Sequence, residues 1–306
     1  MNNNKRKFQI VSILLSFCLA FSLVCSGTVT SNAASGKKAK YIAHRGWSTR
    51  APENSLAAFA LAAGNSKFYG VEFDVWESAT EPSTKDITET VIDEEGNEIT
   101  QTRTVPNDPL LLVMHDASTG RMCGANANIQ SINRASLNNY NITGGKNAGW
   151  YPGQKIPTVE QALDTIWRNS AGAIPVIELK HRLSPRALDY LLNCIGSHNA
   201  VIISFDYNAV SDAARMSESK GMRGNIQTMY LMSKLKKKKI KAAIRQVRAG
   251  EIDCISVKYT SVNKKMVKKF HRAGIKVCTW TVPSKKKARK YARMGVDYIT
   301  ANGPVW

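Results

Sequence analysis

Short runs of β-branched and apolar residues alternate with amphipathic stretches over most of the chain beyond residue 39. The stretch at residues 56–63 repeats apolar positions at i, i+3, i+4 and i+7, which is the spacing of one helix face. From Ile174 onward the apolar runs begin every 20 to 28 residues, a cadence typical of strand–helix units with parallel strands. Eight such runs predict a closed (β/α)8 barrel, or TIM barrel, over an open sheet.

The predicted barrel strands are Lys40–His44, Tyr69–Val75, Ile174–Leu179, Ala200–Ser204, Asn225–Leu231, Asp253–Val257, Lys276–Thr281 and Val296–Thr300. Helices are expected between them, at about 158–169, 184–195, 207–220, 238–249, 263–273 and 284–294 in the later part of the chain. Few residues follow the last strand, so we expect a truncated C-terminal end without a full eighth helix.

An insertion interrupts the alternation after the second strand. Ile87–Ile92 and Glu98–Val105 flank a turn that contains Gly and Asn, so residues 77–109 are expected to hold a β-hairpin. Leu110–His115 follows without an intervening helix and is expected to run antiparallel to the second strand. Residues 117–157, rich in Asn, Gly and Ser, predict a second, irregular segment on the barrel rim.

The first 34 residues differ from the barrel region at 35–306. Lys5–Lys7 are basic, Phe8–Val24 is a run of seventeen uncharged residues, and small residues follow up to Ala34. A basic start, an apolar middle and a small-residue exit predict a secretory signal peptide at residues 1–34. A retained membrane anchor is the alternative, since seventeen residues could just span a bilayer. In both cases we expect a secreted or cell-envelope location.

Charge is unevenly distributed along the 306 residues, which carry 43 Lys and Arg against 23 Asp and Glu. Residues 234–293 hold 21 bases and two acids, whereas residues 72–98 hold ten acids and one base. This segregation differs from a uniformly basic nucleic-acid coat, and no nucleic-acid partner is expected. The 234–293 region is interpreted first as the solvated face of barrel helices, with attachment to an anionic envelope polymer or membrane surface as the alternative.

Three acidic side chains fall at the predicted C-terminal ends of two adjacent strands, which lie on the active face of barrel enzymes. Glu72 and Asp74 are two residues apart, so their side chains point to the same side of one strand. Glu178 ends the neighbouring strand. Three carboxylates without sulfur or imidazole partners suit a hard cation, Ca²⁺ or Mg²⁺.

Imidazole and basic side chains are expected at the same mouth. His44 and Arg45 close the first strand, His115 closes the returning strand, and Lys180 comes two residues after Glu178. Each short motif occurs by chance in unrelated proteins. Their convergence on one mouth has no simple structural explanation and predicts a catalytic site.

The motifs at these strand ends, taken together, resemble a known family. In chain order they are His44-Arg45-Gly46, Pro52-Glu53-Asn54-Ser55, Glu72-x-Asp74, His115-Asp116, Ile156-Pro157-Thr158, Glu178-x-Lys180 and Trp280-Thr281-Val282. The set is similar to the glycerophosphodiester phosphodiesterases over nearly all of residues 40–304. The resemblance implies a cation-dependent barrel that hydrolyses glycerophosphodiesters to glycerol 3-phosphate and an alcohol.

The resemblance also implies roles for individual residues. It makes Glu72, Asp74 and Glu178 the metal ligands, His44 and His115 the acid–base pair, and Arg45 and Lys180 the phosphate contacts. The chain departs from the family pattern in two places. The excursion at residues 77–109 is longer than the usual turn, and Asn302 stands where a Thr-Asp-x-Pro pattern has an acid.

Hydrolysis of a phosphodiester needs a base for the nucleophile and an acid for the leaving oxygen. We predict His44 as the base and His115 as the acid. The nucleophile is either water or the substrate's own glycerol hydroxyl, which would give a cyclic intermediate. Trp280, at the end of the seventh strand, is expected to form an apolar wall of the substrate pocket, with rim packing as the alternative.

Three functions remain open at the level of the sequence. The first is an exported phosphodiesterase for small glycerophosphodiesters. The second is the same barrel acting on lysophospholipids, phosphoinositides or teichoic-acid-like polymers. The third is a non-catalytic module that binds envelope polymers, and the intact set of two histidines and three carboxylates argues against it.

Overall fold

The structure is a computed structural model that describes residues 39–92, 95–235 and 237–306. The signal peptide predicted at residues 1–34 lies outside the described residues. Within the described ranges, no helix combines the length and the apolar character needed to cross a membrane.

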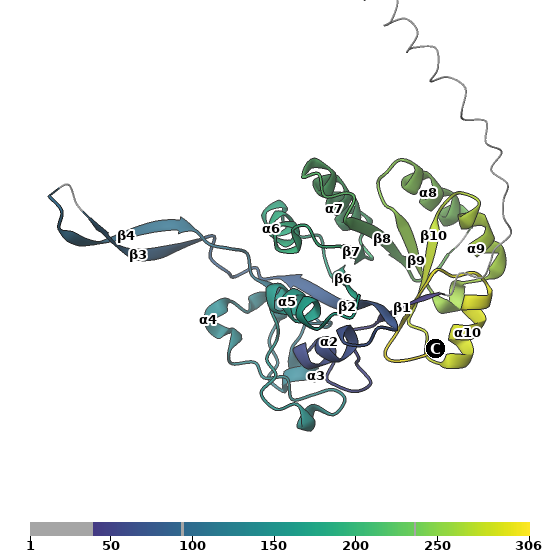
Figure 1. Ribbon diagram of the computed structural model, residues 1–306, viewed down its shortest axis with the longest axis horizontal. Helices are drawn as coiled ribbons and strands as arrows, with labels where there is room; N and C mark the ends of the chain where they lie inside the picture. Colours follow the sequence, from purple (N-terminus) through teal and green to yellow (C-terminus); the bar gives the residue numbers. More distant parts are fainter. Residues whose placement is uncertain (1–38, 93–94, 236) are drawn as a thin grey trace, which may run out of the picture. The chain divides into compact units, whose positions relative to one another are not determined.

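Eight parallel strands close into a barrel in the described part of the chain (Figure 1). Their order is β1-β11-β10-β9-β8-β7-β6-β2, and β2 pairs again with β1 to complete the ring. The (β/α)8 fold predicted from the apolar runs is thus confirmed. The strands are β1 (Lys40–Ala43), β2 (Phe68–Glu77), β6 (Ile174–Leu179), β7 (Ala200–Ser204), β8 (Ile226–Met232), β9 (Cys254–Lys258), β10 (Lys276–Trp280) and β11 (Tyr298–Ala301).

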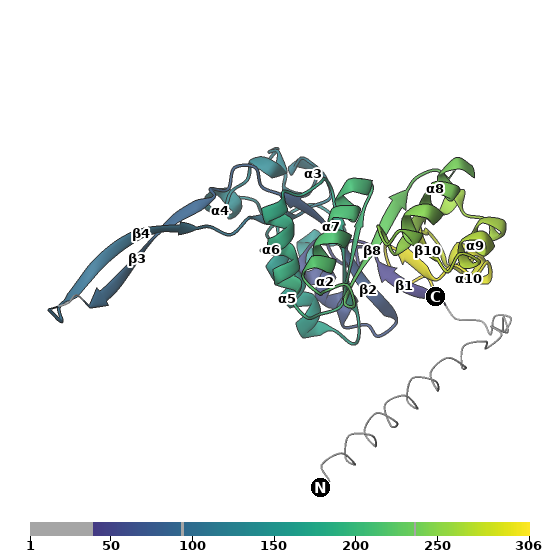
Figure 2. The ribbon, with the colours of Figure 1, turned by 90° about the horizontal axis from the view of Figure 1, so that it is seen from above.

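A helix packs outside the barrel in each crossover from β1 to β11 (Figures 1 and 2). These helices are α2 (Leu56–Ala63), α5 (Val159–Asn169), α6 (Pro185–Ile195), α7 (Tyr207–Ser219), α8 (Lys237–Arg248), α9 (Lys264–His271) and α10 (Lys285–Arg293). Polar caps define most of their starts: Ser55 and Thr158, for example, each accept a hydrogen bond from a backbone N–H of the first turn. No described helix follows β11, and Trp306 packs edge-on against Tyr41 and Phe68.

The barrel interior has an apolar floor, formed by inward residues of successive strands. Its members are Ile42, Val176, Val201, Ile203, Met229, Leu231, Cys254, Cys278 and Tyr298. Gly70 faces the same floor, where a Cβ atom would lie 2.8 Å from Val176 Cγ2, so a larger residue would collide with the packed core. Cys254 and Cys278 are buried free thiols. The next inward positions toward the C-terminal ends of the strands carry polar and charged side chains, such as Glu72 and Glu178.

The insertion after β2 contains the predicted hairpin. Strands β3 (Thr84–Ile92) and β4 (Glu98–Pro106) pair with each other and extend away from the barrel (Figures 1 and 2). Side-chain hydrogen bonds join the two strands, as between Glu89 and Arg103. The chain then returns as β5 (Leu111–Val113), which is antiparallel to β2 as predicted.

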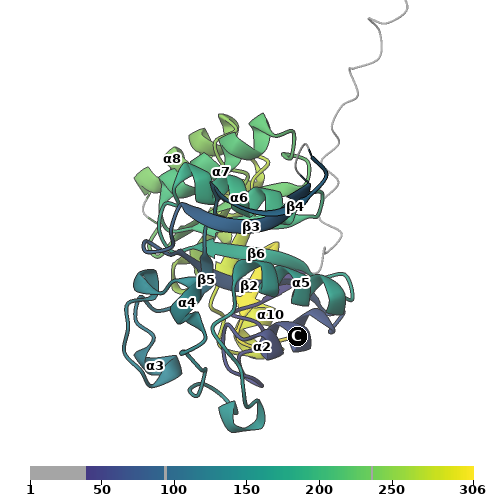
Figure 3. The same ribbon diagram turned by 90° about the vertical axis from the view of Figure 1, so that its left-hand side faces the viewer.

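The rim segment that follows β5 is irregular, with short helical turns and long loops. Its helices are α3 (Gly120–Cys123) and α4 (Arg134–Leu137), and 3-10 turns lie at Ile129–Ser131 and Ala148–Trp150. Apolar residues of the segment, among them Met122 and Ile132, pack on Leu112 of β5. Figure 3 shows α3 and α4 on one side of the barrel, with α4 next to β5, and Arg121 of α3 pairs with Glu53 in the loop before α2 (2.6 Å).

The hairpin should be dispensable for folding of the barrel. We expect that replacing residues 84–106 by an Asn-Gly turn changes the melting temperature by only a few degrees, because an isolated two-stranded hairpin contributes little stability. The backbone N–H of Asn107 already donates to the carbonyl of Ser83 (2.9 Å) and closes the base of the hairpin. Thermal unfolding followed by circular dichroism measures the effect.

The matched contrast is Leu112→Ala in fully buried β5. This change should destabilise the protein by about 2–5 kcal/mol, because it leaves a cavity in the core. Loss of a cooperative transition in the hairpin deletion would contradict the expectation.

Candidate active site

The structure brings most of the predicted site residues to one pocket of about 110 Å³ at the C-terminal ends of the barrel strands. His44 and Arg45 follow β1, His115 follows β5, and Lys180 follows β6. The pocket is lined by His44, Arg45, Glu72, His115, Glu178, Lys180 and Trp280. Asp74 is fully buried on β2 directly behind this lining.

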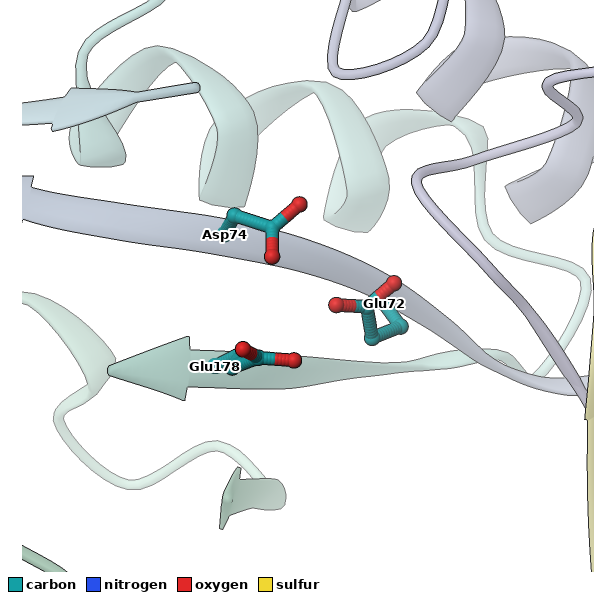
Figure 4. A group of neighbouring side chains, drawn as sticks. All are labelled: Glu72, Asp74 and Glu178. Carbon is teal, nitrogen blue, oxygen red and sulfur yellow. The ribbon is translucent and has the colours of Figure 1, made fainter. Parts of the chain in front are cut away.

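The three predicted carboxylates form a compact cluster. Glu72 and Asp74 project from the same side of β2, and Glu178 projects from the adjacent strand β6 (Figure 4). One oxygen from each lies within 4.8 Å of the others. The three residues are at most 8% exposed, so solvent does little to screen the mutual repulsion of their carboxylates.

Arg45 and Lys180 compensate part of this buried negative charge. The backbone N–H of Arg45 donates to Glu72 Oε2 (2.7 Å), and its Nε lies 3.4 Å from Asp74 Oδ2. Lys180 Nζ donates to Glu178 Oε1 (2.8 Å) and to Asp74 Oδ1 (3.3 Å). Each carboxylate therefore has a positive or N–H partner.

The compensation is incomplete, and Glu72 shows it most clearly. Burial, followed by the charges of Asp74 and Glu178, raises the pKa of Glu72 well above its usual range. Burial and Asp74 likewise raise the pKa of Glu178. Burial alone would raise the pKa of Asp74, but Lys180 and Arg45 hold it below its usual value.

The donor set fits a divalent cation. Glu72 Oε1 is buried and has no hydrogen-bond partner among the described residues, which is costly unless a ligand supplies the missing contact. The other atoms that could ligate a metal here are also carboxylate oxygens, the preferred ligands of Ca²⁺ and Mg²⁺. Glu72, Asp74 and Glu178 are therefore the residues that could hold such an ion.

Each histidine of the pocket has a partner that fixes one ring nitrogen. His44 Nδ1 lies 2.7 Å from Asn302 Oδ1, an acceptor, so Nδ1 carries the proton and Nε2 is left with its lone pair. His115 Nδ1 lies 2.6 Å from Asp116 Oδ1. Burial and the neighbouring Arg45 lower the pKa of His44 to about 4, so its imidazole is neutral at physiological pH.

Several partners of these residues were not predicted from the sequence. Asn54, in a motif that had been noted without a role, donates from Nδ2 to Asp74 Oδ2 (2.8 Å). Asn302, which stands where the family pattern has an acid, contacts His44 because β11 pairs with β1 in the closed barrel. Phe205, just after β7, lines the pocket and packs edge-on against Trp280 at a ring-centre distance of 5.2 Å. Only the apolar strand-end position of Phe205 could have pointed to it.

The fold and this site together define a barrel phosphodiesterase. The profile of the glycerophosphoryl diester phosphodiesterase family matches residues 105–305, and the chain belongs to this family. His115, Glu178, Lys180 and Trp280 fall inside the matched range, whereas the residues contributed by β1 and β2 precede it.

Relatives and solved structures agree with this family. The chain is 25% identical over 272 residues to YhdW of Bacillus subtilis (strain 168), whose name places it among the glycerophosphodiester phosphodiesterases; the match covers 86% of this chain and 94% of YhdW. A phosphodiesterase of Oleispira antarctica, solved in complex with the product sn-glycerol-3-phosphate, superposes with a TM-score of 0.66 at 21% identity, covering 88% of this chain and 94% of that one. A glycerophosphodiester phosphodiesterase of Parabacteroides distasonis gives 0.62 at 22% identity, with 87% and 94% covered. At these identities the structural similarity supports the fold alone.

Cation binding should strengthen as pH rises. The raised pKa of Glu72 means that this group holds a proton at mildly acidic pH, and a cation must displace that proton. We expect both Ca²⁺ and Mg²⁺ to bind more weakly at about pH 5 than at about pH 8, with proton release. Calorimetric titration in buffers of different ionisation enthalpy measures both quantities.

The variant Glu72→Gln should weaken cation binding by more than about tenfold, since even loss of an outer partner costs roughly 10–100-fold. Glu89→Gln, on the exposed hairpin, is the control and should bind normally. Equal affinity at both pH values, or an unaffected Glu72→Gln protein, would contradict the assignment of this cluster as the cation site.

Proposed function

We propose that the protein hydrolyses glycerophosphodiesters to glycerol 3-phosphate and an alcohol, with His44 and His115 as the acid–base pair. The observation that supports this most is the convergence of both imidazoles and the carboxylate cluster on one pocket. The family to which the chain belongs supports the same reaction class.

The two imidazoles suit opposite tasks. Water, or the glycerol hydroxyl of the substrate, attacks phosphorus and gives its proton to Nε2 of His44, which is free because Nδ1 is bound to Asn302. Attack by the glycerol hydroxyl would give a cyclic phosphate, which water then opens to glycerol 3-phosphate. The P–O bond to the alcohol breaks, and the leaving oxygen takes a proton from Nε2 of His115. The Asp116 carboxylate lies 2.6 Å from Nδ1 of His115 and so holds the ring in place for this step.

Positive charge is needed where the phosphorane-like transition state accumulates negative charge. Arg45 and Lys180 line the pocket beside the carboxylates and can contact the non-bridging phosphate oxygens. A divalent cation, Ca²⁺ or Mg²⁺, held by Glu72, Asp74 and Glu178 would neutralise the same oxygens and polarise the attacking hydroxyl.

The opposite wall of the pocket is apolar and bears on the substrate. Phe205 and Trp280 form an aromatic pair above Ile203, Met229 and Leu231. Phe205 is 44% exposed, which is unusual among the large apolar side chains that the structure describes. Such a wall can contact the carbon skeleton of glycerol, and it also favours lysophospholipids over phosphoinositides as a second substrate class.

We also propose that the enzyme is exported by residues 1–34 and stays close to an anionic polymer or membrane surface of the cell envelope. Helices α9 and α10 both begin just after strand ends that line the pocket region, and exposed lysines occupy their first turns. Lysine is unfavourable there, because the helix dipole is positive at the N-terminus. Charges placed against this preference support a binding role for this basic face.

The catalytic proposal is tested with residues 35–306 and glycerophosphocholine, by following release of glycerol 3-phosphate with and without chelator. We expect His44→Ala and His115→Ala each to lose about 10²–10⁴-fold in kcat/KM, the usual contribution of a general acid or base. His271→Ala, where the ring instead pairs with Asp297 on the barrel exterior, should retain full turnover.

Turnover that survives in His44→Ala, or none on any diester, would reject the enzymatic role of the pair. Turnover unaffected by chelator would reject the cation alone. A panel with lysophospholipid, glycerophosphoinositol and polyglycerolphosphate distinguishes the substrate classes, and Phe205→Ala should impair lysophospholipid most.

The surface proposal is tested by neutralising the first turn of α10. Replacing Lys285–Lys287 by Gln should weaken binding to anionic vesicles or polyglycerolphosphate on the order of 100-fold at low salt, because each Lys near an anionic surface contributes about 1 kcal/mol. Gln at Lys67, Lys146 and Lys220 provides a control with the same charge change. Equal weakening in both proteins would reject a localised surface. Thermal stability should not fall, since the removed charges oppose the helix dipole.

A further inference from the structure

One arginine of the rim segment connects two parts of the pocket that are distant in sequence. Arg121, in α3, donates from Nη2 to Glu53 Oε1 (2.6 Å) and from Nε to Asp116 Oδ2 (2.6 Å). Glu53 belongs to the loop before α2, and Asp116 follows β5. Arg121 itself does not line the pocket, so its contacts act behind the pocket wall.

Both acids that Arg121 holds have their other contact in the pocket. Glu53 Oε1 also accepts from Nη1 of Arg45 (2.9 Å). Asp116 uses its second oxygen, Oδ1, for Nδ1 of His115 (2.6 Å). The result is a chain of ion pairs and hydrogen bonds, Arg45–Glu53–Arg121–Asp116–His115, with Arg121 at its centre.

The geometry at Asp116 explains what Arg121 can do. Asp116 is about one-third exposed, and a carboxylate that accepts only one hydrogen bond could rotate toward solvent. Burial would raise the pKa of Asp116, but the hydrogen bonds from Arg121 and His115 keep it low and the group ionised. With Oδ2 fixed by Arg121, Oδ1 stays on Nδ1 of His115, which leaves Nε2 as the free nitrogen of a ring that lines the pocket.

Arg121 has a rigid support of its own. The next residue, Met122, is 1% exposed in the apolar cluster under the rim. Its carbonyl accepts the N–H groups of Thr143 and Gly144 (both 2.8 Å). Gly144 has to be glycine, because a Cβ atom there would lie 2.4 Å from the carbonyl oxygen of Arg121. The backbone of Arg121 is therefore clamped from two sides.

We propose that Arg121 is a positioning residue, which orients His115 through Asp116 and holds Arg45 through Glu53. This inference rests on the proposed roles of His115 and Arg45. The ion pairs involving Arg121 are half-exposed, so they add little to overall stability. Their effect is on geometry, and a misplacement of about 1 Å in an active site can cost on the order of 100-fold in rate.

The test uses Arg121→Met and Arg121→Lys with two substrates that differ only in the leaving group. The choline of glycerophosphocholine leaves as an alkoxide and needs a proton from His115. The nitrophenol of the p-nitrophenyl ester of glycerol phosphate leaves as a stable phenolate and needs none. We expect Arg121→Met to lower kcat at least about tenfold on glycerophosphocholine and less than about threefold on the nitrophenyl ester. KM should rise on both, through Arg45, and Arg121→Lys should recover part of each loss.

Arg134→Met is the matched control. Arg134 is also a partly exposed arginine in a short helix of the rim segment, but it pairs with Glu81, outside the pocket. Arg134→Met should leave kcat and KM unchanged on both substrates. Equal loss on both substrates in Arg121→Met, with an unchanged melting temperature, would reduce Arg121 to a structural residue and overturn the proposal.

Two further variants keep the result interpretable. If Arg121→Met does not fold, Asp116→Asn tests the same link from Arg121 to His115 and should show the same leaving-group dependence. His115→Ala separates this inference from the proposed function. If His115→Ala affects both substrates equally, the acid role of His115 fails; if it shows leaving-group dependence and Arg121→Met does not, only the positioning role fails.

Discussion

The burial of three carboxylates at one point of the barrel is the constraint on which the site depends. Ionised carboxylates in a low-dielectric interior are costly unless each has a partner. Arg45 and Lys180 supply those partners to Glu72, Asp74 and Glu178, yet one oxygen of Glu72 remains unpaired. The cluster is therefore stable enough to form but still deficient in positive charge, which is the condition for binding a cation.

The loop between β1 and α2 is shaped by the same requirement. Arg45 and Asn54 adopt φ of 56° and 55°, left-handed values that cost about 1–3 kcal/mol each for residues other than glycine. The strain places the N–H of Arg45 on Glu72 and the amide of Asn54 on Asp74. At Gly46 the missing Cβ allows contact with Ala58, since a Cβ would lie 2.7 Å from its carbonyl carbon. Backbone strain is thus tolerated where it places hydrogen-bond donors on the buried carboxylates.

The sequence was sufficient for the barrel and for the carboxylate cluster, because the barrel follows from local periodicity and the cluster from that periodicity together with the pairing of adjacent strands. Strand-length runs at a regular interval imply parallel strands, and residues two apart share one side of a strand, as Glu72 and Asp74 do. Contacts made by loops were out of reach. Asn302 meets His44 only because closure brings β11 beside β1, 258 residues away. Arg121 meets Glu53 only through the conformation of an irregular segment, which no periodicity encodes.

The large positive charge of the chain and the chemistry of the pocket can now be separated. The pocket needs only Arg45 and Lys180, whose positions are set by buried carboxylates. The exposed lysines at the starts of α9 and α10 have no such partners in their first turns, where no acid is present. Because outer helices of a barrel begin on the face where its strands end, these lysines surround the same mouth. If these lysines bind an anionic surface, the pocket would open toward that surface. Attachment would then orient the enzyme toward phosphodiesters of the surface.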